Sequence, residues 1–411
     1  MALPSDSLWR NREFLRLWSA QGVSVFGSEL ASLAYPLTAI VVLQAGVFET
    51  SVLQAAGGAA AFTVGLFVGV IADRVRRKPL LIVSDLGRAG LAFTIPVAAF
   101  FGVLRIEQLY VVAFLAGALN ILWLVAAMAL TPSLVEKEQL VESNSKMSTT
   151  ESVAMIAGPG ISGVLLQVVT APLAIVCDAA SFLVSAALIW RIRAPEVLSE
   201  KEPRSVWTEI GEGLRFVYRH PILRPLAESI ALYFFFRQLV LALFLLYAVR
   251  VLDLEPFFLG VIFSGLGFGF LCGALTVRRI TVRFGIGRTM IFANLLNIFS
   301  LALVPLAAGS KLPVVSLLAV SHFLHAFGVQ INGINLVSLR QSITPNDLQG
   351  RMTASFRFVN VGMIALGALI AGGLGEWIGL RATLVIGVAG MILPFLRLVF
   401  SPVRNFSGLT E

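Results

Sequence analysis

The sequence predicts an all-α membrane protein with twelve transmembrane helices in two pseudo-symmetric six-helix bundles. The chain has 411 residues, of which 57% are hydrophobic and only 13% are charged, a balance far from that of a soluble domain. Apolar runs of about 20 residues, each able to cross roughly 30 Å of hydrocarbon as a helix, recur along its whole length. One long polar interval divides these runs into six and six.

The apolar runs define the predicted spans. None alternates with the period of two that a membrane barrel strand requires, so we expect helices, which pair every backbone polar group internally. In chain order the spans are 16–43, 50–72, 79–101, 108–131, 150–168, 171–190, 222–250, 257–277, 288–308, 313–338, 353–374 and 382–400.

The polar interval sets the predicted domain organisation. We expect an N-terminal bundle over 1–190, a cytoplasmic linker over 191–221 and a C-terminal bundle over 222–411. The linker contains an amphipathic segment near 205–219, which predicts a short helix.

The two halves also resemble each other internally. A polar loop followed by a Gly-rich helix occurs at 134–165 and again at 342–374. Gly265, Gly269 and Gly273 are spaced by four in the eighth span, and small residues at that spacing let helices approach closely in lipid. Duplicated six-helix halves are typical of a transporter that rocks about a central site.

The basic residues predict the orientation. Of the 31 Lys and Arg residues, 24 fall on the side of the N-terminus and four on the opposite side, which predicts that both termini are cytoplasmic. We expect a multi-pass protein of the cytoplasmic (inner) membrane without a cleaved signal peptide. The net charge of +8 follows from this topology, so no nucleic-acid partner is expected. The two cysteines indicate neither a disulfide framework nor a zinc site, and we expect a monomer.

The loop after the second span, in "GVIADRVRRKPLL" at 69–81, has a distinctive order of residues. It contains Gly69, Asp73, Arg74, Arg77 and Lys78. This pattern resembles the loop signature of the major facilitator superfamily, with Arg76 where that family usually has Gly. The segments "NREFLRLWSAQGVSVFGSELASLAYPL", "EGLRFVYRHPILR" and "LQGRMTASFRFVN" are similar to its drug-exporter branch, which includes macrolide and siderophore efflux proteins.

The resemblance covers the whole chain and implies a function. It implies an efflux antiporter of the multidrug-resistance type, which exports an amphipathic small molecule in exchange for protons by alternating access. A siderophore or lysophospholipid transporter on the same scaffold is the alternative. No phosphate-binding loop and no clustered nucleophile and base are present, so we expect neither an ATP-driven pump nor an enzyme, and no cofactor.

The resemblance also implies a conformational latch at the loop signature. Asp73 would accept hydrogen bonds from the start of the eleventh span and stabilise the outward-open state. Arg74, Arg77 and Lys78 would contact anionic headgroups or acids of the other half, although they also satisfy the positive-inside rule alone. Asp85 and Arg88, three residues apart, would pair with each other or brace this latch.

Polar residues inside the spans predict the transport cavity, because an ionisable side chain at the bilayer centre costs about 2.5–3.5 kcal/mol on insertion scales. In the tenth span, Ser321, His325, Gly328, Asn332 and Asn335 share one face. In the first span, Gln21, Ser24, Ser28, Ser32 and Tyr35 form a similar stripe with Glu29 beside it. The resemblance places spans 1, 4, 7 and 10 around the cavity, which adds Asn120, Tyr233, Arg237 and His322.

Glu29 is the candidate for proton exchange. Burial favours the neutral form of a carboxyl, whereas a nearby Arg237 would favour the ionised form. A permanent ion pair between Glu29 and Arg237 that only joins the halves is the alternative.

Three other residues have competing interpretations. For Asp178 in the sixth span we favour a structural hydrogen bond. His322 and His325 suggest substrate contact, titration or buried packing rather than a metal site, because no further ligand follows at suitable spacing. No metal site is predicted.

Overall fold

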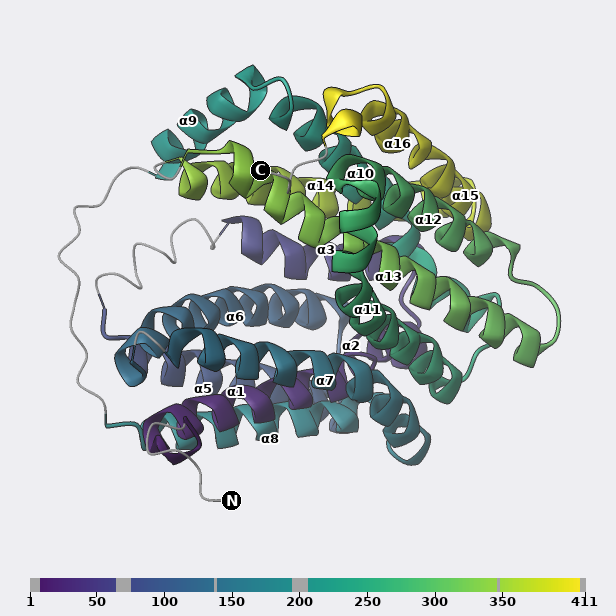
Figure 1. The fold of residues 1–411 in the computed structure, drawn as a ribbon. Helices are drawn as coiled ribbons and strands as arrows, with labels where there is room; N and C mark the ends of the chain where they lie inside the picture. Colours follow the sequence, from purple (N-terminus) through teal and green to yellow (C-terminus); the bar gives the residue numbers. More distant parts are fainter. Residues whose placement is uncertain (1–7, 64–74, 137–138, 194–205, 346–347, 407–411) are drawn as a thin grey trace. The chain divides into compact units, whose positions relative to one another are not determined.

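The computed structural model describes residues 8–63, 75–136, 139–193, 206–345 and 348–406. In these ranges the regular secondary structure is helical throughout, which confirms the predicted all-α class (Figure 1). The internal contacts divide the chain into two compact units. Unit 1 comprises 1–45 with 56–203, and unit 2 comprises 46–55 with 204–411.

Eleven helices within the described ranges are long and apolar enough to cross a membrane. Their bounds agree with the predicted spans to within about ten residues, because hydropathy over a bilayer thickness sets both. The remaining predicted span, 50–72, begins as α3 (Val47–Thr63), and the rest of it lies outside the described residues.

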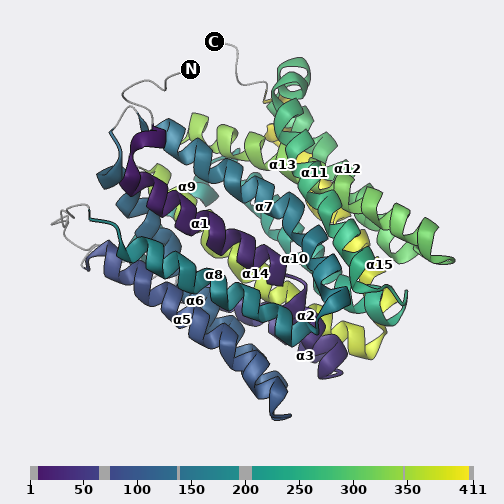
Figure 2. The same cartoon turned by 90° about the horizontal axis from the view of Figure 1, so that it is seen from below.

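In the described ranges, unit 1 is built from a segmented first span and four further long helices. Its elements are η1 (Leu8–Arg10), α1 (Arg12–Ala31), α2 (Ala34–Leu37), the π-helix η2 (Thr38–Val42), α5 (Arg77–Phe100), α6 (Ile106–Leu134), α7 (Leu140–Val168) and α8 (Ala171–Trp190), with the later residues of α3. Helix α1 packs against α7 and α8, and Figure 2 shows it running between them. Helix α5 packs against α6 and α8.

The first span is interrupted after α1. Asn11 caps its start by accepting hydrogen bonds from the backbone N–H groups of Glu13 and Phe14. Pro36 has no N–H to donate to the carbonyl of Ser32, so the α-helical bond at that position cannot form. The chain turns at Ser32 and continues as α2 and then as a π-helix, a rare geometry that is frequent at functional sites.

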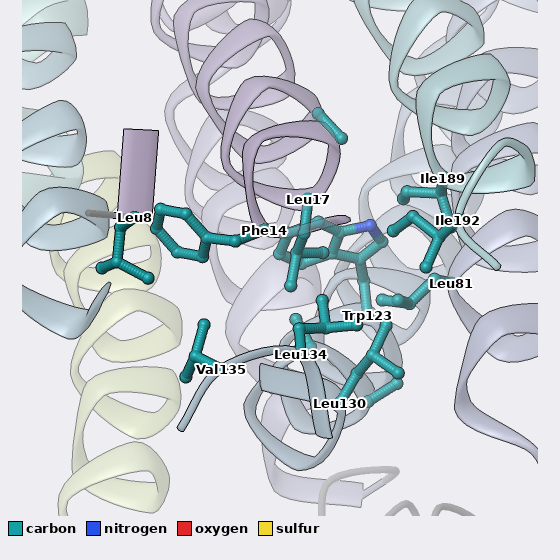
Figure 3. Close-up of a cluster of buried hydrophobic side chains, with 13 residues drawn as sticks. Leu8, Phe14, Leu17, Leu81, Trp123, Leu130, Leu134, Val135, Ile189 and Ile192 are labelled. Atoms are coloured by element: carbon teal, nitrogen blue, oxygen red, sulfur yellow. The ribbon is translucent and has the colours of Figure 1, made fainter. Parts of the chain in front are cut away.

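A hydrophobic cluster closes one end of unit 1 (Figure 3). It contains Leu8, Phe14, Leu17, Leu81, Trp123, Leu130, Leu134, Val135, Ile189 and Ile192. These side chains come from η1, α1, α5, α6 and the end of α8, so the cluster ties these elements together where their ends meet. Such packing is what drives helix association in lipid.

Unit 2 has a similar number of long helices. Its elements are α9 (Val206–Arg219), α10 (Leu223–Arg250), α11 (Pro256–Phe284), α12 (Ile286–Leu306), α13 (Lys311–Ile343), α14 (Gln349–Trp377), α15 (Leu380–Gly390), α16 (Ile392–Val399) and η4 (Pro402–Asn405), with the first residues of α3. Helix α13 packs against α11 and α12, and α10 packs against α14 and α15.

Close helix packing in unit 2 depends on glycine. A Cβ atom at Gly269 of α11 would overlap the backbone carbonyl of Phe323 on α13, as the spacing of the α11 glycines predicts. Helix α9 begins one residue from its predicted start and groups with unit 2 rather than standing apart as a linker. Glu212 of α9 forms an ion pair with Arg351 of α14 at 2.8 Å.

Candidate functional site

Polar side chains of the spans gather in one place in each unit. In unit 1 the centre is Asp178 on α8, which is only 3% exposed. Ser28 of α1 donates a hydrogen bond to one carboxyl oxygen of Asp178 at 3.0 Å, and Tyr35 of α2 donates to the other at 2.9 Å. The structural hydrogen bond expected for Asp178 is therefore present, and its two donors are residues that the sequence analysis assigned to the cavity.

A second buried group lies beside it, around the ion pair of Asp85 and Arg88. The guanidinium of Arg88 contacts the Asp85 carboxylate at 2.5 Å and donates to the amide oxygen of Asn120 at 3.0 Å. Ser185 and Trp123 donate to the other oxygen of Asp85 at 2.7 and 3.3 Å. Asp85 and Arg88 thus pair with each other, which is the first of the two predicted roles. Asn120 accepts a hydrogen bond from Arg88 of this pair.

Two other residues of the first-span stripe, Gln21 and Ser32, also have partners within unit 1. Gln21 donates to the carboxylate of Glu151 on α7 at 2.6 Å. The hydroxyl of Ser32 donates to the backbone carbonyl of Glu29 at 2.7 Å, at the turn after α1. Glu29 is half-buried and lies against Gly158 of α7, where a Cβ would overlap it.

In unit 2 the polar residues surround a cavity of about 80 Å³ between α10, α12, α13 and α16. Its lining includes Ser229, Tyr233, Phe234, Arg237, Asn294 and Asn332. Tyr233 is 6% exposed, and its hydroxyl has no hydrogen-bond partner in the described part of the chain. The same holds within those ranges for Nε of Arg237 and the amide oxygen of Asn332.

These groups give the cavity a definite chemistry. Leaving a buried polar group without a partner costs about 1–3 kcal/mol, so the hydroxyl, the guanidinium and the amide are suited to bind polar atoms of a ligand or water. Arg237 is the charged residue of the lining, and no acidic residue lines the cavity within the described ranges. The site is therefore suited to a ligand that carries an anionic or hydrogen-bond-accepting group.

The two histidines of α13, one of the helices around this cavity, are both buried. Nδ1 of His322 lies 2.9 Å from the carbonyl of Leu318, and its ring contacts those of Phe244 and Phe263 with centroids at 4.3 and 5.6 Å. Neither ring nitrogen of His325 has a partner among the described residues. Within those residues no group of three or more His, Cys, Asp or Glu side chains is placed to hold a metal ion.

Asn335 has a packing contact that its place on the polar face of α13 did not indicate. Its amide oxygen accepts a hydrogen bond from Thr281 of α11 at 2.9 Å, and its amide nitrogen donates to the carbonyl of Ile331. The side chain thus joins α13 to α11.

The loop signature is described only in part. Gly69, Asp73 and Arg74 lie outside the described residues. Lys78 donates to the carbonyl of Ile192, just beyond α8, at 2.6 Å, and Arg77 is the first residue of α5. The latch therefore stays a prediction. The pairing of Glu29 with Arg237 also stays a prediction, because these residues belong to different units.

Comparison with known proteins identifies the family. The family model described as "transmembrane secretion effector", of the major facilitator (MFS) type, matches residues 6–410. This chain belongs to that family. It is a membrane transporter and not an enzyme, as the sequence predicts.

Three relatives align over nearly the full length of this major facilitator protein. The uncharacterized MFS-type transporter YfiS of Bacillus subtilis is 26% identical, with 95% of this chain and 93% of the relative covered. Macrolide efflux protein A of Streptococcus pyogenes is 24% identical, with 92% and 94% covered. The enterobactin exporter EntS of Citrobacter koseri is 24% identical, with 96% and 93% covered.

Solved structures show the same fold. The nucleoside transporter NupG superposes with a TM-score of 0.75 at 12% identity, and 95% of this chain and 98% of NupG are covered. A bacterial homologue of the iron transporter ferroportin, in an inward-facing state, gives a TM-score of 0.74 at 15% identity, with 96% and 98% covered. The predicted major facilitator fold is confirmed.

Several residues of both sites could not be identified from the sequence. Ser185 and Trp123 serve Asp85, and Ser229 and Asn294 line the cavity of unit 2. The twelfth-span region also contributes, through Leu398. One signal was available, because Asn294, Asn297 and Ser300 recur every third residue along α12 and are all buried.

Proposed function

We propose that this protein exports an amphipathic small molecule across the cytoplasmic membrane in exchange for protons, by alternating access. The cavity of unit 2 carries the proposal. It combines unpartnered polar groups of Tyr233, Arg237 and Asn332 with apolar lining such as Phe234 and Met290. The cavity of about 80 Å³ is smaller than the roughly 300–1,000 Å³ of a pocket for a whole drug-sized ligand, so it would receive the polar group of the substrate and not its whole hydrophobic body. The macrolide and enterobactin exporters among the relatives support the outward direction.

Proton exchange is assigned to Glu29. The carboxylate is half-buried in the first span and lies next to the turn at Ser32, where the helix is interrupted. An ionisable group held within a span and beside an interruption of its helix is placed to couple its charge to a change in shape. In such an exchange, protons would enter as the substrate leaves.

A siderophore is the second candidate substrate. The enterobactin exporter EntS is similar over nearly the whole chain, and the positive charge of Arg237 in the cavity suits an anionic chelator. A lysophospholipid, with a phosphate-bearing headgroup and one acyl chain, would be recognised by the same chemistry.

Overproduction of the protein in a susceptible host tests the proposal. We expect the minimum inhibitory concentration of a macrolide or another amphipathic drug to rise several-fold, and a protonophore to abolish the rise. Arg237→Gln should reduce the effect, most for an anionic compound, whereas Arg224→Gln should keep it. Arg224 is a matched control because it is an exposed cation on the same helix, paired with Glu228. If no drug is affected while secreted siderophore increases, the second candidate replaces the first.

A further inference from the structure

We infer that Asp178 binds and releases a proton, and that this exchange sets the geometry of the interruption in the first span. The inference rests on proton-coupled export as proposed above. Asp178 would be a second proton-binding residue besides Glu29, and its position next to the interruption indicates which part of the fold its charge affects.

The two donors to Asp178 come from opposite sides of the interruption. Ser28 lies in α1, before the turn, and Tyr35 lies in α2, after it. Each donates to a different carboxyl oxygen, at 3.0 and 2.9 Å. The α-helical bond from position 36 to Ser32 is missing because Pro36 has no N–H, so these two side-chain bonds add links between the segments where the backbone lacks one.

Protonation changes what Asp178 can accept. A carboxylate offers both oxygens as acceptors, whereas a carboxylic acid uses one oxygen as a donor. When a hydronium ion transfers its proton to one oxygen, an O–H bond of hydronium breaks, an O–H bond forms on the carboxyl, and water leaves. That oxygen is then a weaker acceptor with its own O–H to donate, so the hydroxyl that donated to it can accept instead. Release of the proton to water restores the two donated bonds. Protonation therefore changes one of the two hydrogen bonds that connect α1 and α2 through Asp178.

The surrounding charges assign the exchange to Asp178 rather than to Asp85. Arg88 of α5 interacts electrostatically with Asp178, and Tyr35 of α2 is its other titratable neighbour in the described part of the chain. Arg88 is already committed to Asp85 at 2.5 Å and to Asn120. This group of residues thus has one cation, Arg88, for the two carboxylates of Asp85 and Asp178. In the described part of the chain, the hydrogen bonds to the Asp178 carboxylate come from the neutral hydroxyls of Ser28 and Tyr35.

Asp178 lies at a depth where this excess of negative charge is costly. The residue lies near the middle of α8 (Ala171–Trp190) and is 3% exposed. An unpaired charge at that depth is costly, whereas a carboxylate paired with a guanidinium and bonded by Ser185 and Trp123 is compensated. Proton binding removes the uncompensated charge of Asp178 and leaves the pair of Asp85 and Arg88 intact.

Infrared difference spectroscopy of the purified full-length protein in liposomes tests the proton site without any substrate. Between alkaline and acidic pH, we expect wild type to gain protonated-carboxyl absorption with one component that remains in Glu29→Gln and is missing in Asp178→Asn, where the other carboxyls still contribute. An Asp178→Asn difference spectrum with the same carboxyl intensity as wild type would overturn the inference.

A distance measurement tests the coupling to the interruption. Spin labels at exposed Val23 in α1 and Val41 in η2, with Cys177 and Cys272 replaced by Ser, report the distance across the turn. We expect a pH-dependent shift of this distance in wild type and none in Tyr35→Phe. The Tyr35→Phe variant keeps the Asp178 carboxyl and its infrared band, so it serves as the test if Asp178→Asn does not fold. A shift that persists in Tyr35→Phe would contradict the coupling. A failure of drug or siderophore export would instead refute the proposed function and leave both measurements standing.

Discussion

Tyr35 donates a hydrogen bond to Asp178 at 2.9 Å, and this bond joins the short helix after the interruption of the first span to α8. It lies in a buried environment where hydrogen bonds to charged groups contribute about 1.5–3 kcal/mol. The first span therefore depends on side chains, rather than on its backbone alone, for its position within unit 1.

Loss of the Tyr35 hydroxyl should lower stability measurably. We expect Tyr35→Phe to reduce the free energy of unfolding by about 1.5–3 kcal/mol, because the carboxylate loses a donor while the ring is retained. Thermal unfolding of the protein in detergent, scored by loss of monomer in gel filtration, measures the change. Tyr218→Phe on α9 is the control, since Tyr218 is exposed and should tolerate the change. Equal midpoints for the two variants would contradict the prediction.

The pair of Asp85 and Arg88 should be the more sensitive element. Removing one partner of a buried ion pair leaves an uncompensated charge and costs about 3–5 kcal/mol. We expect Arg88→Leu to fail to accumulate in membranes and Arg88→Leu with Asp85→Leu to recover part of the wild-type level. Glu13→Gln, which breaks a partly exposed pair with Arg16, should change the level little. Membrane levels measured by immunoblot decide the matter, and normal accumulation of Arg88→Leu would count against the pair's structural role.

The cavity of unit 2 should discriminate substrates by charge. Arg237→Gln should abolish export of anionic substrates, because the cavity then holds no cation, whereas Arg237→Lys should retain part of it. Neutral substrates should be affected less, by about ten-fold or under, which corresponds to about 1.4 kcal/mol. Efflux rates of matched charged and neutral compounds from loaded cells provide the measurement. A uniform loss for both classes would mean that Arg237 acts through folding.

His220 should make the start of α10 sensitive to pH. Its Nδ1 accepts hydrogen bonds from the backbone N–H groups of Ile222 and Leu223 at 3.2 and 3.3 Å, and burial lowers the pKa of His220 below its usual 6.5. Because the folded protein binds this proton less tightly, the cap contributes fully above about pH 6.5 and is lost as the pH falls through the folded pKa. His220→Asn, which caps without titrating, should remove this part of the acid dependence of unfolding. An unchanged acid dependence in that variant would exclude the cap as its source.

The positions of the spans could be predicted from sequence, and their side-chain partners could not. Hydropathy over about 20 residues reports the thickness of the bilayer, so helices such as α8 and α10 have bounds within one residue of those expected. Partners depend on how helices pack. The periodicity of the first span places Ser28 and Tyr35 on one polar face, but only the fold shows that α8 presents Asp178 to that face.

The same limit applies in unit 2. The regular spacing of His325, Asn332 and Asn335 marks one polar face of α13, yet Asn332 lines the cavity while Asn335 bonds Thr281 of α11. Residues only three positions apart can meet different neighbours because they lie about 60° apart around the helix axis. Helix α9 was recognised by its amphipathic pattern, but its packing on α14 depends on the tertiary pair of Glu212 and Arg351.

Transport by the purified protein in liposomes under an imposed pH gradient is the measurement closest to the central claim of proton-driven export. The account predicts that substrate accumulates against its gradient, that a protonophore stops accumulation, and that Glu29→Gln exchanges substrate but no longer responds to the pH gradient. Accumulation that proceeds at the wild-type rate without a pH gradient, or in Glu29→Gln with its full response to that gradient, would contradict it.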